Sequence, residues 1–115
     1  MSLTLNVFKT ITAIASTTSV GIYTASTGYS GVVLLAQAAN VSSSTYNVTF
    51  SHQRTTSGIA VTTQIVPSMP IPGNDVLPLL TGRLVAQTGD TLLVSTNDTS
   101  NNNIKIVLSV LETLN

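Results

Sequence analysis

The sequence predicts an all-β protein: a single-domain antiparallel β-sandwich, jelly-roll-like, with about seven or eight short strands. Three observations predict this class. Thr, Val and Ile are abundant, and β-branched residues favour strands. Apolar and polar residues alternate over several runs, which is the period of a strand with one face in water. Turn-forming residues separate these runs at short intervals, as in sandwiches and barrels.

Length and composition restrict the organisation further. The chain has 115 residues and no cysteine, so we expect one domain over residues 1–115, without disulfides or thiolate metal sites. Four basic and four acidic residues make up 7% of the chain, against about 25% in an ordinary soluble domain. Such a surface is either solvated by Ser and Thr hydroxyls or packed against other subunits. The mean hydropathy of +0.41 favours the second explanation.

The same composition argues against two classes of partner. The four basic residues form no patch along the sequence, so nucleic-acid binding loses its main driving force. The longest apolar runs, such as "VVLLA" at 32–36, are far shorter than the roughly 18 residues of a membrane span. Lys9 follows an apolar start instead of preceding it, which is unlike a secretory signal. We therefore expect neither a nucleic-acid nor a membrane partner.

The first third of the chain predicts three extended segments. Leu3, Leu5 and Val7 alternate with polar residues, and residues 1–15 could form a strand, an N-terminal arm exchanged with a neighbour, or both. The runs "VGIYTA" (20–25) and "VVLLAQAAN" (32–40) follow. Gly28 and Gly31 bracket a turn between them, where a positive φ is easy for glycine.

The middle of the chain contains the clearest alternation. In "TYNVTFSH", Tyr46, Val48, Phe50 and His52 share one face, and polar residues occupy the other. The run "IAVTTQIV" at 59–66 alternates similarly, with Ile59, Val61 and Ile65 on its apolar side. The segment 53–58 between the two runs is predicted to be a hairpin loop.

Three prolines fall within the next stretch, "PSMPIPGND". Because proline lacks an amide donor, Pro67, Pro70 and Pro72 suit an edge strand or a crossing segment and not a central strand. We expect a rigid, extended crossover between sheets that turns at Gly73–Asn74. Whether Met69 and Ile71 face the core of this domain or the next subunit is left open by the pattern.

The last third predicts two strands. "TGD" at 88–90 is a tight turn that leads into "TLLVS" at 91–95, and a polar loop, "TNDTSNNN", follows. In the final run, the even-numbered positions 104–110 are all apolar, and the other face is also partly apolar. Such a strand belongs in the centre of a sheet or at a subunit contact.

Candidate chemistry is scarce. We expect the lone histidine, His52, to pack beside Phe50 or to cap an edge, because the commoner zinc sites need three or four ligands. Asp75 and Asp90 lie in predicted turns, where bonds to nearby backbone explain them. Together with Asp98 they could bind calcium if their loops converged, but the spacing lacks a calcium-loop pattern.

No sequence motif of a nucleophile, a phosphate loop or a dinucleotide fold is present, and the tyrosines are too scattered to form a stacking platform. We therefore expect no enzyme, no catalytic, cofactor-binding or metal residues, and no cofactor.

The order of segments from 21 to 111 resembles small β-sandwich structural proteins of tailed bacteriophages, including virion proteins of myoviruses that infect cyanobacteria. The resemblance rests on turn and strand motifs, with one departure: Ser26 stands where that group often has proline. The matching segments are Tyr23-Thr24-Ala25, Pro70-Ile71-Pro72-Gly73-Asn74-Asp75, Leu80-Thr81-Gly82 and Gly89-Asp90-Thr91-Leu92-Leu93-Val94-Ser95.

The resemblance implies a non-enzymatic virion protein, assembled in the host cytoplasm as a head decoration or a tail, neck or baseplate component. Its expected partners are itself, in a trimer or larger ring, and other virion proteins. We expect contacts through Leu3–Phe8, Gln53–Ser57 and Asn97–Asn103. The alternative is a sandwich that binds carbohydrate or a host surface, which requires an exposed aromatic pair near a loop.

Overall fold

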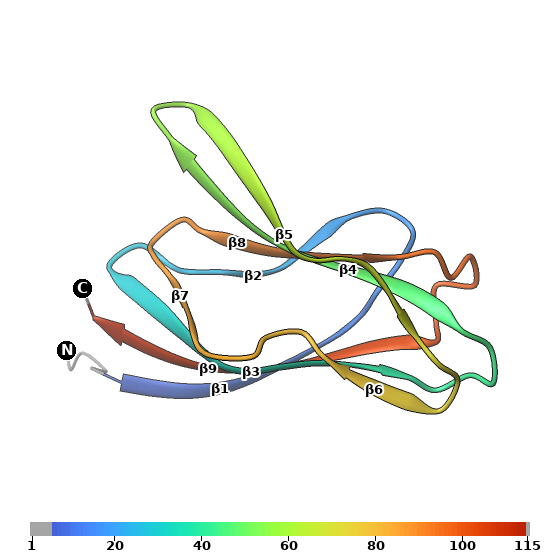
Figure 1. The fold of residues 1–115 in the computed structure, drawn as a ribbon. Coiled ribbons are helices and arrows are strands. Elements are labelled where there is room, and N and C mark those ends of the chain that lie inside the picture. Colours follow the sequence, from blue (N-terminus) through green and yellow to red (C-terminus); the bar gives the residue numbers. More distant parts are fainter. Residues whose placement is uncertain (1–5, 115) are drawn as a thin grey trace.

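The computed structural model describes residues 6–114, and it confirms an all-β sandwich (Figure 1). Its strands are β1 (Asn6–Ile14), β2 (Val20–Thr24), β3 (Tyr29–Asn40), β4 (Tyr46–Thr56), β5 (Ile59–Ile71), β6 (Asp75–Pro78), β7 (Leu84–Ala86), β8 (Thr91–Thr96) and β9 (Ile104–Leu114). The described part of the chain has no helix that could cross a membrane. Residues 6–114 form nine strands instead of about seven or eight, because β6 and β7 are separate strands that both pair with β3.

The strands form two antiparallel sheets. Sheet A has the order β1-β9-β3-β6, with β7 also paired to β3, and sheet B has the order β2-β8-β4-β5. When β6 and β7 are taken as two parts of one interrupted strand, the first strand pairs with the last, the second with the second-last, and so on inwards. This nested pairing, folded into two sheets, is a jelly roll.

The core lies between the inner faces of the two sheets. On β9, Ile104, Ile106, Leu108 and Val110 are buried, as their alternation predicts. β9 lies between β1 and β3, so its predicted central position is also confirmed. Sheet B covers these side chains with buried residues that include Phe50.

The hairpin of β4 and β5 differs from the prediction in two respects. Its loop has only two residues, Ser57 and Gly58, both with positive φ (53° and 79°), as in a type I′ turn. The predicted loop residues 53–56 instead extend β4. In addition, Ile59 and Val61, predicted to lie on an apolar side, are 67% and 60% exposed. The hairpin stands away from the two-sheet body (Figure 1), and no strand of sheet A covers it there.

The proline-rich stretch begins as an edge strand and ends as a crossover. Pro67 and Pro70 lie in β5, which pairs with β4 and is the edge strand of sheet B among the described strands. The turn at Gly73 then leads to β6 in sheet A. Ile71 is buried in the core, whereas Met69 is exposed, so the two side chains face different environments.

The N-terminal strand β1 belongs to sheet A, and Gly28 lies in the turn that precedes β3. β1 pairs along its length with β9 of the same chain, and the remaining residues of the predicted arm, 1–5, lie outside the described residues. In the turn before β3, Gly28 has a φ of 85°, as expected. Gly31, however, lies within β3, where a Cβ would come too close to the hydroxyl of Tyr23.

Candidate interaction surface

The outer face of sheet A carries rows of apolar side chains. Directly opposed residues in a sheet lie on the same face. One such row crosses four strands and consists of Phe8, Leu111, Val32 and Val85. Phe8 is 75% exposed, and Val85 is also exposed. In an ordinary two-layer sandwich this face would be polar, because it faces water.

Further exposed apolar residues extend this surface. Ile14, Leu35, Val76 and Val107 lie on the same face and are exposed. Lys105 is the one charged side chain that the described strands of sheet A place there. β9 has 11 residues, so at about 3.3 Å per residue and about 4.8 Å between strands the face covers on the order of 700 Å². A standard stable interface buries about 800 Å² per partner.

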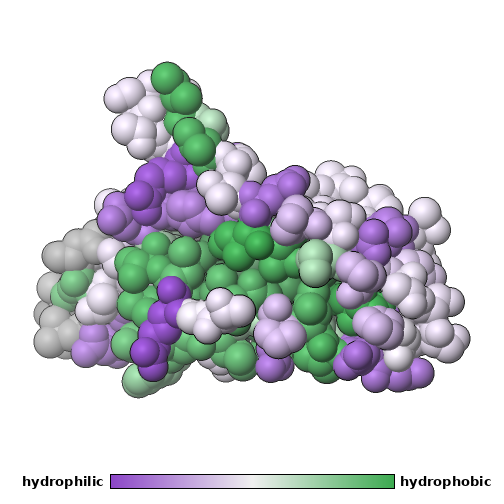
Figure 2. Space-filling model, viewed as in Figure 1, coloured by the Kyte–Doolittle hydropathy of each residue, from purple (hydrophilic) through white to green (hydrophobic). Residues whose placement is uncertain are grey.

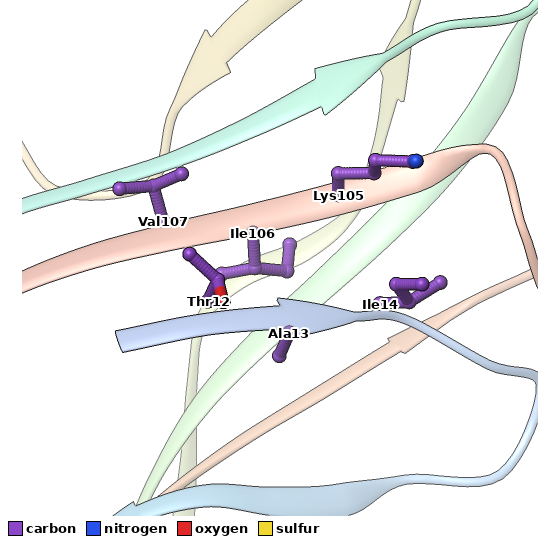
Figure 3. A pocket seen from close by; sticks show the side chains of 6 residues that line it. All are labelled: Thr12, Ala13, Ile14, Lys105, Ile106 and Val107. Atoms are coloured by element: carbon purple, nitrogen blue, oxygen red, sulfur yellow. The ribbon is translucent and has the colours of Figure 1, made fainter. Parts of the chain in front are cut away.

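A shallow groove lies on this sheet between β1 and β9 (Figure 3). It has a volume of about 630 Å³ and is lined by residues 12–14 and 105–107. The polar side-chain groups in its lining are the Thr12 hydroxyl and the Lys105 ammonium group, among Ile14, Val107 and other apolar side chains (Figure 3). An ammonium group beside a single hydroxyl has no carboxylate or imidazole to exchange protons with, so the groove is better suited to apolar contact.

A polar cluster joins the base of the β4–β5 hairpin to β8. The buried Asp90 carboxylate accepts hydrogen bonds from Arg54 Nη2 (2.7 Å) and Nε (3.0 Å) and from the Gln87 amide (2.9 Å). His52 Nε2 lies 2.9 Å from the same carboxylate. The hydrogen bond from Arg54 lowers the pKa of Asp90 to about 2, although burial alone would raise it. Asp90 therefore stays ionised and fixes the hairpin to β8.

We missed this cluster in the sequence, because we expected His52 to pack beside Phe50 or to cap an edge and explained Asp90 as a turn residue. Asp90 does close the predicted turn, since its amide donates to the Gln87 carbonyl oxygen (2.8 Å). Its carboxylate, however, binds side chains 36 and 38 residues away. The detectable signal was the placement of His52 and Arg54 two residues apart on one strand face.

The inner face of the hairpin, next to this cluster, is grooved. The groove has a volume of about 230 Å³ and is lined by His52, Arg54, Thr56, Val61 and Thr63. These residues share a face because His52 opposes Thr63 and Arg54 opposes Val61. The face continues the core side of sheet B beyond the part that sheet A covers.

A second polar cluster lies near the C-terminal end of β9. The buried Glu112 accepts a hydrogen bond from the Tyr23 hydroxyl (2.9 Å) and pairs with Lys9 (2.8 Å). The pKa of Glu112 is lowered, mainly by the hydrogen bond from Lys9. The pKa of Tyr23 is raised, first by burial and then by its hydrogen bond to Glu112. Gly31 leaves room for the tyrosine hydroxyl. The cluster ties β1, β2 and β9 together across the two sheets.

The remaining carboxylates serve their own loops. Asp98 is buried and accepts hydrogen bonds from the Ser100 hydroxyl (2.6 Å) and from backbone amides of Ser100, Asn102 and Asn103. These bonds, with that from Ser100 first, lower the pKa of Asp98 to about 2. Asp75 bonds the next amide and is exposed. Residues 6–114 contain no group of three His, Asp or Glu side chains that could hold a metal. Asp75, Asp90 and Asp98 therefore do not converge on one site, as calcium binding would require.

A further opening lies between the sheets along the β5 and β6–β7 side. This cleft has a volume of about 480 Å³ and is lined mainly by apolar residues, among them Val66, Leu79, Leu80 and Leu84. Figure 2 shows hydrophobic surface along the middle of the side in view, and again on the protruding hairpin. The exposed apolar surface is therefore distributed over the outer face of sheet A, this cleft and the hairpin.

No protein-family model matches this chain, and no curated protein is similar to it in sequence.

Proposed function

We propose that this protein is a non-enzymatic structural subunit of a tailed-bacteriophage particle, assembled in the host cytoplasm as a head decoration or a tail, neck or baseplate component. Its partners are copies of itself, in a trimer or larger ring, and other virion proteins; nucleic acid and membranes are not among them. The jelly roll recurs in viral capsid proteins, but also in lectins and cupins, so the fold alone does not determine the function.

The observation that carries this proposal is the outer face of sheet A. Exposed apolar patches larger than a few hundred Å² are uncommon on monomers and mark contact sites. Here exposed apolar side chains, among them Phe8, Val85 and Val107, are spread over a face of on the order of 700 Å² that also carries the hydroxyls of Thr10 and Thr12, and Lys105 is its charge among the described strand residues. In a free monomer such a surface favours aggregation, whereas in an assembly it becomes buried.

The carbohydrate-binding alternative lacks its required feature. All five aromatic residues lie in the described part of the chain. Phe8 is the exposed one, Tyr23 and Phe50 are buried, and Tyr29 and Tyr46 are half-buried at the starts of β3 and β4. An exposed aromatic pair beside a loop is therefore not formed by these side chains.

Two measurements test the proposal. Sedimentation velocity of the purified protein should show concentration-dependent association, and mass spectrometry should detect the chain in purified particles of a phage whose genome encodes it. The double variant Val85→Glu/Val107→Glu places charges on the outer face of sheet A and should abolish both results. Thr62→Glu, on an exposed strand position of the hairpin, is the control and should abolish neither. A strict monomer that is absent from particles would refute the proposal.

A further inference from the structure

The groove on the inner face of the β4–β5 hairpin has the dimensions of a site for one side chain. Its volume of about 230 Å³ is below the roughly 300 Å³ at which small-molecule sites begin. The hairpin around it is closed by a two-residue turn, and at its base Arg54 donates a hydrogen bond to Asp90. A groove that accepts one side chain is typical of the pockets that receive anchor residues at protein interfaces.

The chemistry of this groove favours an aromatic occupant. Val61 supplies an apolar wall, and Thr56 and Thr63 supply methyl groups and hydroxyls without charge. Arg54 presents a planar guanidinium that is 43% exposed and held in place by Asp90, and such a group binds aromatic rings by cation–π contact. Because Asp90 neutralises Arg54, the site offers little attraction to an anion.

Phe8 matches this site in chemistry and exposure. It is the most exposed of the large hydrophobic side chains in the described residues, and it lies on edge strand β1. It also lies on the outer face of sheet A, which points away from sheet B, so it cannot enter the groove of its own chain. An aromatic side chain and an aromatic-sized groove therefore face solvent on opposite sheets of one molecule.

We propose that Phe8 of one copy inserts into the hairpin groove of the next copy, between Arg54 and Val61. This inference rests on the proposed self-assembly and names the residues that make its contact. Because the two halves of the contact lie at different places on the chain, the contact is head-to-tail, and such contacts close into rings or extend into filaments.

The size of the contact favours a closed ring over an isolated pair. Two strands of about five residues present an inner face of roughly 17 Å by 10 Å, which is under 200 Å². That is far below the roughly 800 Å² per partner of a stable pairwise interface. In a ring, each copy contributes both a phenylalanine and a groove. The other contacts of the ring then hold the two partners of each contact close together.

Disulfide trapping tests the contact directly, since the chain has no cysteine of its own. Thr10→Cys places a thiol beside Phe8 on the same face of β1, and Thr63→Cys places one at the groove. Mixing these two variants under oxidation should give at least fivefold more cross-linked dimer than either variant alone. Thr62→Cys, on the opposite face of the hairpin, replaces Thr63→Cys in the matched control and should give only background. Adding Phe8→Ala to the Thr10→Cys chain should remove the product.

The proposal is overturned if Thr62→Cys cross-links as well as Thr63→Cys, or if Phe8→Ala leaves the yield unchanged. Sedimentation velocity distinguishes a wrong contact from a failure of the proposed self-assembly. If the unmodified protein associates but Phe8→Ala weakens association less than threefold, the assembly stands and this contact is wrong. If the contact is right, Phe8→Ala weakens association at least tenfold. The control Met69→Ala, an exposed residue elsewhere on the surface, should change it less than twofold.

Discussion

Replacing Asp90 with asparagine tests the polar cluster at the base of the hairpin. The buried carboxylate accepts hydrogen bonds from Arg54, His52 and the Gln87 amide. Asparagine keeps one acceptor oxygen but turns an NH₂ group toward these donors. Hydrogen bonds to charged groups each contribute about 1.5–3 kcal/mol, and Arg54, at 43% exposed, can recover part of its solvation. We therefore expect Asp90→Asn to lower the free energy of unfolding by about 2–3 kcal/mol at pH 7.

The pH dependence of this effect follows from the lowered pKa of Asp90. Arg54 is the main cause that brings this pKa from 3.8 to about 2 in the folded protein. Because the folded value is the lower one, ionisation stabilises the folded state above pH 3.8, and this contribution is lost as the pH falls through 2. The shift corresponds to about 2 kcal/mol, which the exposure of Arg54 reduces to about 1–2 kcal/mol.

Urea unfolding followed by far-UV circular dichroism measures both effects, since the chain has no tryptophan to report fluorescence. The difference in unfolding free energy between the natural protein and Asp90→Asn should shrink by about 1–2 kcal/mol from pH 5 to pH 2. Asp75→Asn, at an exposed position, is the control and should change stability by less than about 0.5 kcal/mol. A cost below about 0.5 kcal/mol for Asp90→Asn at pH 7, or an unchanged difference at pH 2, would refute the reasoning.

Two further substitutions test the core and the crossover by the same unfolding assay. Leu108→Ala removes a fully buried side chain from central strand β9 and should lower the free energy of unfolding by about 3–5 kcal/mol. Val107→Ala, on the outer face, should lower it by under about 1 kcal/mol. Similar losses for the two variants would contradict the assignment of faces. Gly73→Ala would place a Cβ 2.5 Å from the Ser43 carbonyl carbon and should lower the free energy of unfolding by at least about 2 kcal/mol. Gly82→Ala, with open space around it, should leave stability nearly unchanged. A neutral Gly73→Ala would show that the backbone shifts freely.

Local patterns predicted the elements that depend on local physics. The alternation at 104–110 correctly gave the buried face of β9, because inner and outer faces of a strand differ at every second residue. Pro67 and Pro70 correctly indicated an edge, because neither can donate to a neighbouring strand. The same alternation was misleading at Ile59 and Val61, since it shows which residues share a face but not how far the opposing sheet extends.

The candidate site could be predicted only in part, because its residues are joined by strand register. His52 and Arg54 reach Asp90 because β4 pairs with β8, with His52 opposite Leu92 and Gln53 opposite Thr91. A shift of one residue would turn the side chains of β4 to the other face and break the cluster. Nothing local in the sequence specifies that register. The apolar row across sheet A was hidden for the same reason, since its residues come from four strands.

The extent of the β4–β5 hairpin supports an intermolecular role for its inner face. β4 and β5 have 11 and 13 residues, whereas β6 and β7, on the opposite sheet, have four and three. The nested strand pairing of the jelly roll is complete without the outer part of the hairpin, and its exposed side chains Ile59 and Val61 contribute little to the core. Complete burial of such a side chain is worth about 1.5–3 kcal/mol, and Ile59 and Val61, at 67% and 60% exposed, keep more than half of it in the monomer. That free energy is still available when the monomer has folded, and it is released only when another molecule covers the hairpin.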